Sequence, residues 1–476
     1  MNSISRAVMI AITLSALQPV GALAEQRKVA AGADFGDYIV TAAPIYKQLA
    51  ELRGEERFPA GARLLLVHNG KSEPLVPEFA ASVDADVSFD GLWVMFAGKK
   101  NAGDPWQIWE VNLQDRKVRS VVATKTDAVR PLYLPGGRLV WAQRTANGFE
   151  LESTEDARRR EAPALNPTAG PGITPLTYIR GNAFPTGVLR DGRIMFEAGF
   201  PFDAAATPEI YLVYADGSGV ESYRCDHGRG RWGARQLASG DVVFTHGSEL
   251  GRFSSPFAHE SQIAAPAAQY AGSVAETVAG AWLLSTRQAG QSHYAINLWN
   301  PKPVSGAQIA KLVPVLAVTG VDLVDPVLVG TRARPNRHPS GLHPWNYANL
   351  LALDARISRD GTLRETPAEV RVEVQDANGR AAVAGKAPVE QDGSFYVRVP
   401  GDRPIRFSLL DKKGIVLRQE RGWFWARGGE QRYCTGCHAG PERGSENRVP
   451  AVLMRSTTPT DLTDLKMILS PTRGGQ

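Results

Sequence analysis

The feature that most constrains the fold is a short unit that recurs along the first two thirds of the chain. In each copy a tight turn ending in glycine is followed directly by a short apolar strand, as at Asp90-Gly91 before residues 92–96. The turn glycines are Gly91, Gly137, Gly192, Gly240 and Gly280. Successive glycines are 46, 55, 48 and 40 residues apart. A period of this length, with several strands in each unit, is typical of a β-propeller.

The repeat has a physical reason, which is the packing of one small sheet on the next. Each unit is a small sheet that cannot bury both of its faces alone, and packing such sheets around an axis builds a continuous core. Five units are visible, and the apolar segments 64–67 and 321–330 can supply or close others. We therefore expect a propeller of about six or seven blades over residues 61–330. A β-sandwich with coincidental spacing is the alternative.

The beginning of the chain has the pattern of an export signal. Arg6 precedes an apolar stretch over residues 7–17, and Ala22-Leu23-Ala24 fits the A-x-A cleavage pattern. We expect residues 1–24 to be a signal peptide and the mature protein to be periplasmic. An uncleaved membrane anchor is the alternative. No later apolar stretch is long enough to span a bilayer, so no membrane span is expected after cleavage.

Residues 25–60 are expected to connect the signal to the propeller. Apolar residues at helical spacing predict one amphipathic helix within residues 37–55: Ile39, Ala43, Tyr46, Leu49 and Leu52.

A second β-rich region is predicted over residues 331–476. It begins with a basic, proline-rich link at residues 332–339, which we expect to be a solvated loop unless its arginines bind a cofactor. Apolar and polar residues then alternate over residues 370–374, 394–399 and 405–410. This pattern predicts a small antiparallel sandwich, so the whole chain is expected to be mainly β.

One motif in this region carries chemistry: Cys434-Thr435-Gly436-Cys437-His438, which is C-x-x-C-H. This spacing is typical of c-type haem attachment. Two thiols three positions apart can each bond one vinyl group of the same porphyrin, and the adjacent imidazole can bind the iron. The motif predicts one covalent haem c held by Cys434 and Cys437, with His438 as the proximal iron ligand.

Other uses of these cysteines remain open. A thioredoxin-like site would need a βαβ context, which the sequence does not offer. A zinc site would need further ligands, and Cys225 or a distant histidine can supply one. A disulfide between Cys434 and Cys437 is the third alternative. With three cysteines in all, the chain has no disulfide framework.

The distal iron ligand is less defined. Met454 lies 16 residues beyond His438, and a thioether ligand would raise the reduction potential, as in electron carriers. As a residue beside Leu453, Met454 also fits the core of the domain. Met467, His338 and His343 are further candidates, and an open sixth position would allow small-ligand chemistry.

Here the sequence resembles a known family, that of the hydrazine synthase alpha subunit. The resemblance is carried by residues 423–438 around the motif, 446–451 after it and 388–396 before it, and more generically by propeller strands such as 189–196. It covers roughly residues 85–455. It implies a propeller followed by a haem-bearing β domain. In that family's catalytic haem a tyrosine after the motif can replace the histidine, and here no tyrosine follows Cys437. His438 is therefore kept as the expected ligand.

These features lead to three functional hypotheses. The first is an exported monohaem cytochrome that transfers electrons to a redox partner protein. The second is a haem oxidoreductase acting on a small nitrogen or oxygen compound at an open iron site. The third is a propeller binding module with a structural haem. The formal charge of +5 is spread over 476 residues without a basic run, so no nucleic-acid partner is expected.

Overall fold

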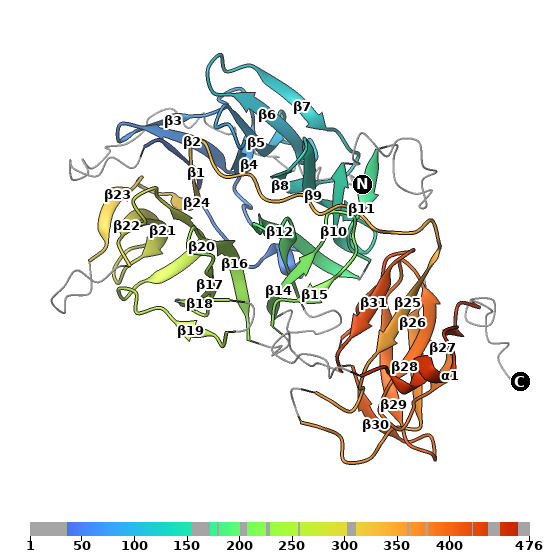
Figure 1. Cartoon of the computed structure of the whole chain (residues 1–476). Coiled ribbons are helices and arrows are strands. Elements are labelled where there is room, and N and C mark those ends of the chain that lie inside the picture. The colour runs from blue at the N-terminus through green and yellow to red at the C-terminus, as the bar shows by residue number, and fades with distance from the viewer. Residues whose placement is uncertain are drawn as a thin grey trace, which may run out of the picture.

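The computed structural model describes residues 36–154, 172–178, 180–199, 207–224, 229–255, 258–301, 311–358, 361–376, 379–420, 422–436 and 448–464. Within these ranges the chain is almost entirely β, with one short α-helix and one 3-10 helix. Figure 1 shows a large body of radiating sheets from blue to yellow, with a smaller orange and red domain at its side. No helix of the described residues is long and apolar enough to cross a membrane.

The large body is a propeller with six blades in the described part of the chain (Figure 1). Three blades are β4 (Ala81–Val87), β5 (Trp93–Lys99), β6 (Gln107–Asn112) and β7 (Val118–Val122); β8 (Ala128–Leu134), β9 (Arg138–Thr145), β10 (Gly148–Thr154) and β11 (Ile173–Pro175); and β12 (Gly181–Val188), β13 (Ile194–Gly199), β14 (Pro208–Val213) and β15 (Glu221–Ser222). Two more are β16 (Arg231–Gln236), β17 (Val242–His246), β18 (Glu249–Phe253) and β19 (Ser261–Gln262); and β20 (Gln269–Glu276), β21 (Trp282–Arg287), β22 (Ala295–Trp299) and β23 (Val313–Leu316). The propeller expected from the turn spacing is confirmed.

The sixth blade joins the two ends of the propeller sequence. β24 (Asp322–Leu328) pairs with β1 (Tyr38–Ala43), which continues into β2 (Arg63–His68) and β3 (Lys71–Pro74). Tyr38 lies opposite Leu328 in the antiparallel register. The first strand therefore closes the ring, which leaves fewer exposed sheet edges.

This closure corrects the helix expected over residues 37–55. The segment 38–43 is a strand whose residues are almost all buried, because both faces of a blade pack against neighbouring blades. Only η1 (Glu51–Arg53) is helical, and it is a single 3-10 turn. The apolar residues at helical spacing do reach the core: Tyr46, Leu49 and Leu52 pack there from the loop between β1 and β2. Short apolar runs do not distinguish a buried strand from a helix, which is why the pattern misled.

The innermost strands of all six blades share an irregularity. In each of them the register to the second strand shifts, so that the inner strand bulges. Five of the six bulges contain a residue with positive φ: Asp84, Arg130, Gly233, Gly272 and Asp325. Because the inner strands contact one another around the axis, the six bulges form a ring there.

A linker, residues 329–346, runs across the propeller to the smaller domain (Figure 1). Its side chains are largely exposed, as expected for a solvated loop, but its backbone is held. The Arg332 amide donates to the Phe89 carbonyl at 3.1 Å, and the Asn336 amide donates to the Arg190 carbonyl at 2.8 Å. His338 stacks on Tyr214 with ring centroids 3.9 Å apart. The linker thus crosses the turns that join the first and second strands of the blades.

The smaller domain is a sandwich of two four-stranded sheets, as expected, but only one of the sheets is antiparallel throughout. In the other sheet both edge strands run parallel to their neighbours. One sheet has the order β31 (Gln431–Cys434), β25 (Tyr347–Ala352), β28 (Phe395–Pro400) and β32 (Thr460–Asp461). The other has the order β27 (Ala381–Pro388), β26 (Glu369–Gln375), β29 (Ile405–Leu410) and β30 (Val416–Gln419). Apolar residues of both sheets fill one core, and α1 (Ala451–Arg455) contacts β28 at its border.

The segment before β31 fixes the sandwich to the propeller. Trp425 is 1% exposed and packs into an apolar cluster of the propeller, where its indole N–H donates to the Gly217 carbonyl at 3.2 Å. Arg427 Nε donates to the Asp216 carbonyl at 2.9 Å, and the Glu430 carboxylate accepts from the Gly219 amide at 3.2 Å. The two domains are therefore joined by buried and polar contacts as well as by the linker.

Candidate functional site

Cys434 ends the edge strand of the sandwich. β31 runs parallel to β25, with Cys434 opposite Ala352, and the Cys434 carbonyl accepts from the Leu353 amide at 2.8 Å. The side chain packs against the core between the two sheets, is partly exposed and has no disulfide partner in the described part of the chain. Burial raises the pKa of the Cys434 thiol. The backbone of the first cysteine of the motif is thus fixed at the end of β31.

The other residues of the motif follow directly. Cys437 and His438 lie outside the described residues, as do Met467 and Cys225. The strand therefore determines where the motif begins, and the predicted roles of Cys437 and His438 stay predictions. No group of three or more His, Cys, Asp or Glu side chains that could hold a metal ion occurs within the described ranges.

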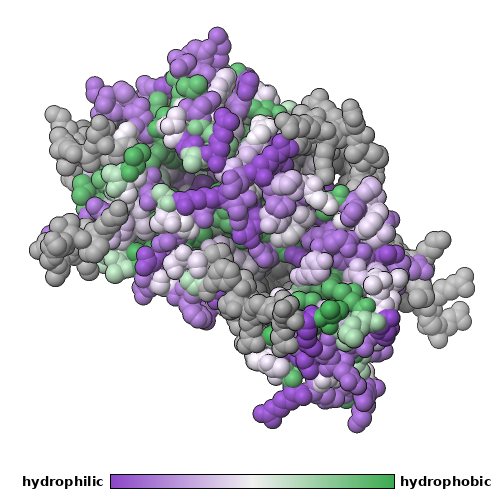
Figure 2. Space-filling view, viewed as in Figure 1, coloured by the Kyte–Doolittle hydropathy of each residue, from purple (hydrophilic) through white to green (hydrophobic). Residues whose placement is uncertain are grey.

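Apolar side chains are exposed on both sides of the motif. Tyr433 is 73% exposed, and Val449 and Met454, which follow the motif, are 65% and 76% exposed. Figure 2 shows a hydrophobic patch framed by hydrophilic surface on the C-terminal domain, on the side where β31 lies.

Met454 belongs to α1, at the same end of the sheet as Cys434. The Val452 amide donates to Ser394 Oγ at 3.0 Å, next to Phe395, and Phe395 and Cys434 flank Ala352 on its two sides. Two strand spacings, about 10 Å, separate those flanking positions. The exposure of Met454 shows that it is not a core residue, so its thioether is free to contact another group.

The two histidines considered as distal ligands lie elsewhere. His338 is stacked on the propeller residue Tyr214, and the His343 amide donates to the Gly429 carbonyl at 3.3 Å. Gly429 precedes β31, five residues before Cys434, which is about 16 Å of extended chain. The contacts that the structure shows for these histidines are thus with the propeller and with the turn before β31, not with Cys434.

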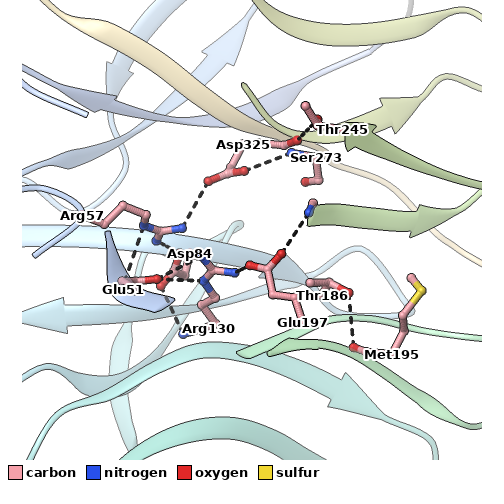
Figure 3. Close-up of polar contacts among 12 residues, drawn as sticks. Glu51, Arg57, Asp84, Arg130, Thr186, Met195, Glu197, Thr245, Ser273 and Asp325 are labelled. Atoms are coloured by element: carbon pink, nitrogen blue, oxygen red, sulfur yellow. Dashed lines mark hydrogen bonds and ion pairs between the residues drawn. The ribbon is translucent and has the colours of Figure 1, made fainter. Parts of the chain in front are cut away.

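A second candidate site lies on the propeller axis, and sequence reasoning missed it (Figure 3). A cavity of about 70 Å³ is lined by residues from all six blades and from the loop between β1 and β2. We call it the axial cavity. Six charged side chains form a network at it, which we call the axial cluster: Glu51, Arg57, Asp84, Arg130, Glu197 and Asp325.

Two arginines bind the four carboxylates of the axial cluster (Figure 3). Arg57 pairs closely with Asp84, and it lies 3.6 Å from Glu51 and 3.5 Å from Asp325. Arg130 pairs closely with Glu197 and lies 2.9 Å from Glu51. Burial opposes the charge of Arg57, but the nearby carboxylates of Asp84, Glu51 and Asp325 outweigh it and raise its pKa. These carboxylates therefore stabilise the charged form of Arg57.

The strand bulges supply further partners for these carboxylates. The Gly233 amide donates to Glu197 Oε2 at 3.0 Å, and the Ser273 amide donates to Asp325 Oδ1 at 3.2 Å. The Arg130 amide donates to Asp84 Oδ2 at 3.1 Å. Each of these bonds joins two neighbouring blades, so the bulges and acids together fasten the inner ring. The sequence does contain a signal for these charged positions. Each is a charged residue within an otherwise apolar inner strand, as at Asp84, Arg130 and Asp325.

The fold and the motif together define the class: a six-bladed propeller joined to a two-sheet β domain whose edge strand leads into a C-x-x-C-H sequence. Residues 358–439 match the family model described as the hydrazine synthase alpha subunit middle domain. Among solved structures, the chain is similar to hydrazine synthase of Kuenenia stuttgartiensis, with 17% identity and a TM-score of 0.73, over 90% of this chain and 72% of that chain. The chain is therefore similar to the hydrazine synthase alpha subunit in the sequence of residues 358–439, and to hydrazine synthase in its fold.

Other similarities are weaker. TolB of Acinetobacter baumannii is 12% identical with a TM-score of 0.45, over 62% of this chain and 67% of that chain. A putative TolB of Agrobacterium tumefaciens is 13% identical with a TM-score of 0.39, over 63% and 94%. No curated protein sequence matches the chain.

Proposed function

We propose that this protein is an exported monohaem c-type cytochrome whose haem is attached through Cys434 and Cys437, with His438 as the proximal iron ligand. Its role is electron transfer to a redox partner protein. Export is part of the proposal, because haem is attached to such motifs outside the bacterial cytoplasm and residues 1–24 have the pattern of a signal peptide.

The observation that carries the proposal is the position of Cys434. The residue is partly exposed at the end of β31, and the rest of a C-x-x-C-H motif follows it directly in the sequence. This is the arrangement needed for bonding to a porphyrin vinyl group, and the motif lies within the region that matches the hydrazine synthase alpha middle domain. A bound haem supplies one-electron chemistry at its iron.

The surroundings of the motif also fit a large apolar group. The exposed side chains of Tyr433, Val449 and Met454 offer apolar contacts, and covering them would remove their surface from water. Met454 is the favoured distal ligand, because its thioether is exposed at the same end of the sheet as Cys434. A methionine opposite the histidine raises the reduction potential, which suits an electron carrier.

The attachment is tested by producing the full chain in a bacterium that matures c-type haem and measuring haem that survives denaturing electrophoresis. We expect one haem per chain in the wild type and none, or only loosely held haem, in Cys434→Ser and Cys437→Ser. Cys225→Ser is the matched control, since it removes the third cysteine of the chain and should keep full haem content. Equal loss in all three variants, or a haem-free wild type, would contradict the proposal.

The role is tested by the sixth iron position. We expect a six-coordinate spectrum that does not change with carbon monoxide, and a lower reduction potential with carbon monoxide binding in Met454→Leu. Met467→Leu is the control and should behave as the wild type. A wild-type spectrum that shifts with carbon monoxide would favour a haem oxidoreductase over the electron carrier.

A further inference from the structure

Three residues that line the axial cavity have nitrogen donors without partners. Arg57 Nε and the indole N–H of Trp232 are buried and have no hydrogen-bond acceptor in the described part of the chain. Arg235 has neither an ion pair nor a side-chain hydrogen bond to any described residue. Because a buried donor without an acceptor costs about 1–3 kcal/mol, the two buried donors call for an explanation, and so does the partly buried guanidinium of Arg235 beside them.

The carboxylates at the cavity do not satisfy these donors. Asp84, Glu197 and Asp325 are occupied by Arg57, Arg130 and the amides of the strand bulges. Glu51 pairs with Arg130 at 2.9 Å, and its other oxygen lies 3.6 Å from Arg57 Nε, which is beyond hydrogen-bond distance. Arg57 and Arg130 are thus paired with the four carboxylates of the axial cluster, and Arg235 is the lining arginine left without a carboxylate among the described residues.

The position of Arg235 is built into the fold. The residue lies on β16, just after the bulge at Gly233, and its side chain passes beside Gly187 of the neighbouring blade. A Cβ atom at position 187 would lie 3.8 Å from Arg235 Cδ and 3.9 Å from a guanidinium nitrogen. The guanidinium thus extends across the junction of two blades toward the axis. Asp86 and Asp325 attract its charge from a distance, while Arg332 and Arg130 repel it.

The cavity has room for a small ligand. Its 70 Å³ exceeds the roughly 10–15 Å³ that one water molecule requires by several-fold, so it can hold a cluster of waters or a ligand of a few heavy atoms. Water offers two acceptor lone pairs but no charge for Arg235. An oxyanion offers both, and a guanidinium binds a planar oxyanion through two parallel hydrogen bonds.

We propose that the axial cavity binds a small planar monovalent oxyanion, of the size of formate or nitrate, with Arg235 as its charge partner. Arg57 Nε and Trp232 Nε1 are the further donors at this cavity. The ligand lies on the axis of the propeller, in a different domain from the C-x-x-C-H motif, so this site does not depend on the presence of a haem.

The test uses the full chain and two probes, sodium formate and sodium nitrate, each titrated against sodium chloride at constant ionic strength. Binding is followed by calorimetry and by thermal unfolding. We expect saturable binding of at least one probe to the wild type, and a melting temperature that rises with its concentration. Arg235→Gln should weaken this binding at least tenfold, because it removes a charged, bidentate donor.

Two further variants make the result decisive. Arg252→Gln is the control, since Arg252 lies on the same blade but is half-exposed at the surface, and it should bind as the wild type. Arg235→Lys should retain part of the affinity. Because Arg235 has no side-chain partner among the described residues, its replacement should leave the melting temperature without probe unchanged or raised. An unchanged or raised melting temperature shows that the variant is folded. Equal binding to Arg235→Gln and wild type would overturn the proposal, as would the absence of saturable binding to the wild type.

Discussion

The contact between the linker and the propeller turns can be tested at two glycines of the repeated turn. Gly192 has a φ of +91°, and a Cβ atom there would lie 2.2 Å from the Asn336 carbonyl oxygen of the linker. Gly137 occupies the equivalent turn of the preceding blade with a φ of +77°, and its Cβ would have no neighbour within 4 Å. Alanine at Gly137 therefore measures backbone strain alone, whereas alanine at Gly192 adds a collision with the linker.

The two costs follow from these distances. A left-handed alanine costs about 1–2 kcal/mol, which is the expected loss for Gly137→Ala. Gly192→Ala must also move the linker by about 1 Å, since carbon and oxygen do not approach within 3 Å without repulsion. Displacing it forfeits the Asn336–Arg190 hydrogen bond and the stack of His338 on Tyr214, each worth about 1 kcal/mol. We expect a total of about 3–4 kcal/mol.

The assay is equilibrium unfolding in urea, combined with limited proteolysis of the native protein. Gly192→Ala should lose about 2 kcal/mol more than Gly137→Ala, and its linker should be cleaved faster near Asn336. Equal losses for the two variants, with equal cleavage rates, would refute the account of a linker packed on the turn.

Three further predictions concern buried groups of the two domains. Burial, with a smaller effect of Glu150, raises the pKa of Glu152 to about 7, so the stability that its protonated form provides is lost as pH rises from about 4.5 to about 7. Glu152→Gln should therefore gain about 2 kcal/mol relative to wild type between pH 5 and pH 8 in urea unfolding, and parallel pH profiles would contradict this. Arg130→Met should cost about 3–5 kcal/mol, because it leaves Glu197 buried without its cation; adding Glu197→Gln should recover part of the loss, and additive losses would disprove the coupling. Trp425→Phe should cost about 1 kcal/mol for the lost N–H bond and Trp425→Ala about 3–5 kcal/mol in thermal or urea unfolding; a neutral alanine variant would show that the domains are not joined there.

The parts of the fold that depend on residues close together in the sequence could be predicted. The turn at Gly192 and its four counterparts predicted the propeller. Each of these tight turns needs a positive φ, which glycine adopts readily, so a glycine marks every repeat. The closing strand could not be found in this way. Residues 38–43 pair with β24, almost three hundred residues later, and their burial on both faces removes the alternation that identifies a strand. The same apolar residues fitted a helix equally well.

The two candidate sites also differ in how far apart their residues lie in the sequence. The C-x-x-C-H motif is contiguous, so its chemistry is visible in five residues of sequence. The axial cavity is assembled from residues of six blades that lie far apart in the sequence, such as Asp84, Arg130 and Arg235, which are 46 and 105 residues apart. A charged residue within an apolar strand signals a buried ion pair, but it does not identify the partner. Only closure of the ring brings these charges together.

The contacts between the domains explain why a propeller accompanies a motif that lies wholly in the sandwich. The residues that the propeller binds, from Trp425 to Glu430, stand directly before β31, and the Arg432 guanidinium within β31 donates to the Val220 carbonyl of the propeller. An edge strand held only by its one neighbour, β25, would fray easily. Here the start of the strand is hydrogen-bonded to a second domain, the propeller. The strand therefore cannot shift its register against β25 without breaking these bonds. The position of Cys434 is therefore set by both domains, and a change in the blade that holds Trp425 would be transmitted to the motif through four residues of strand.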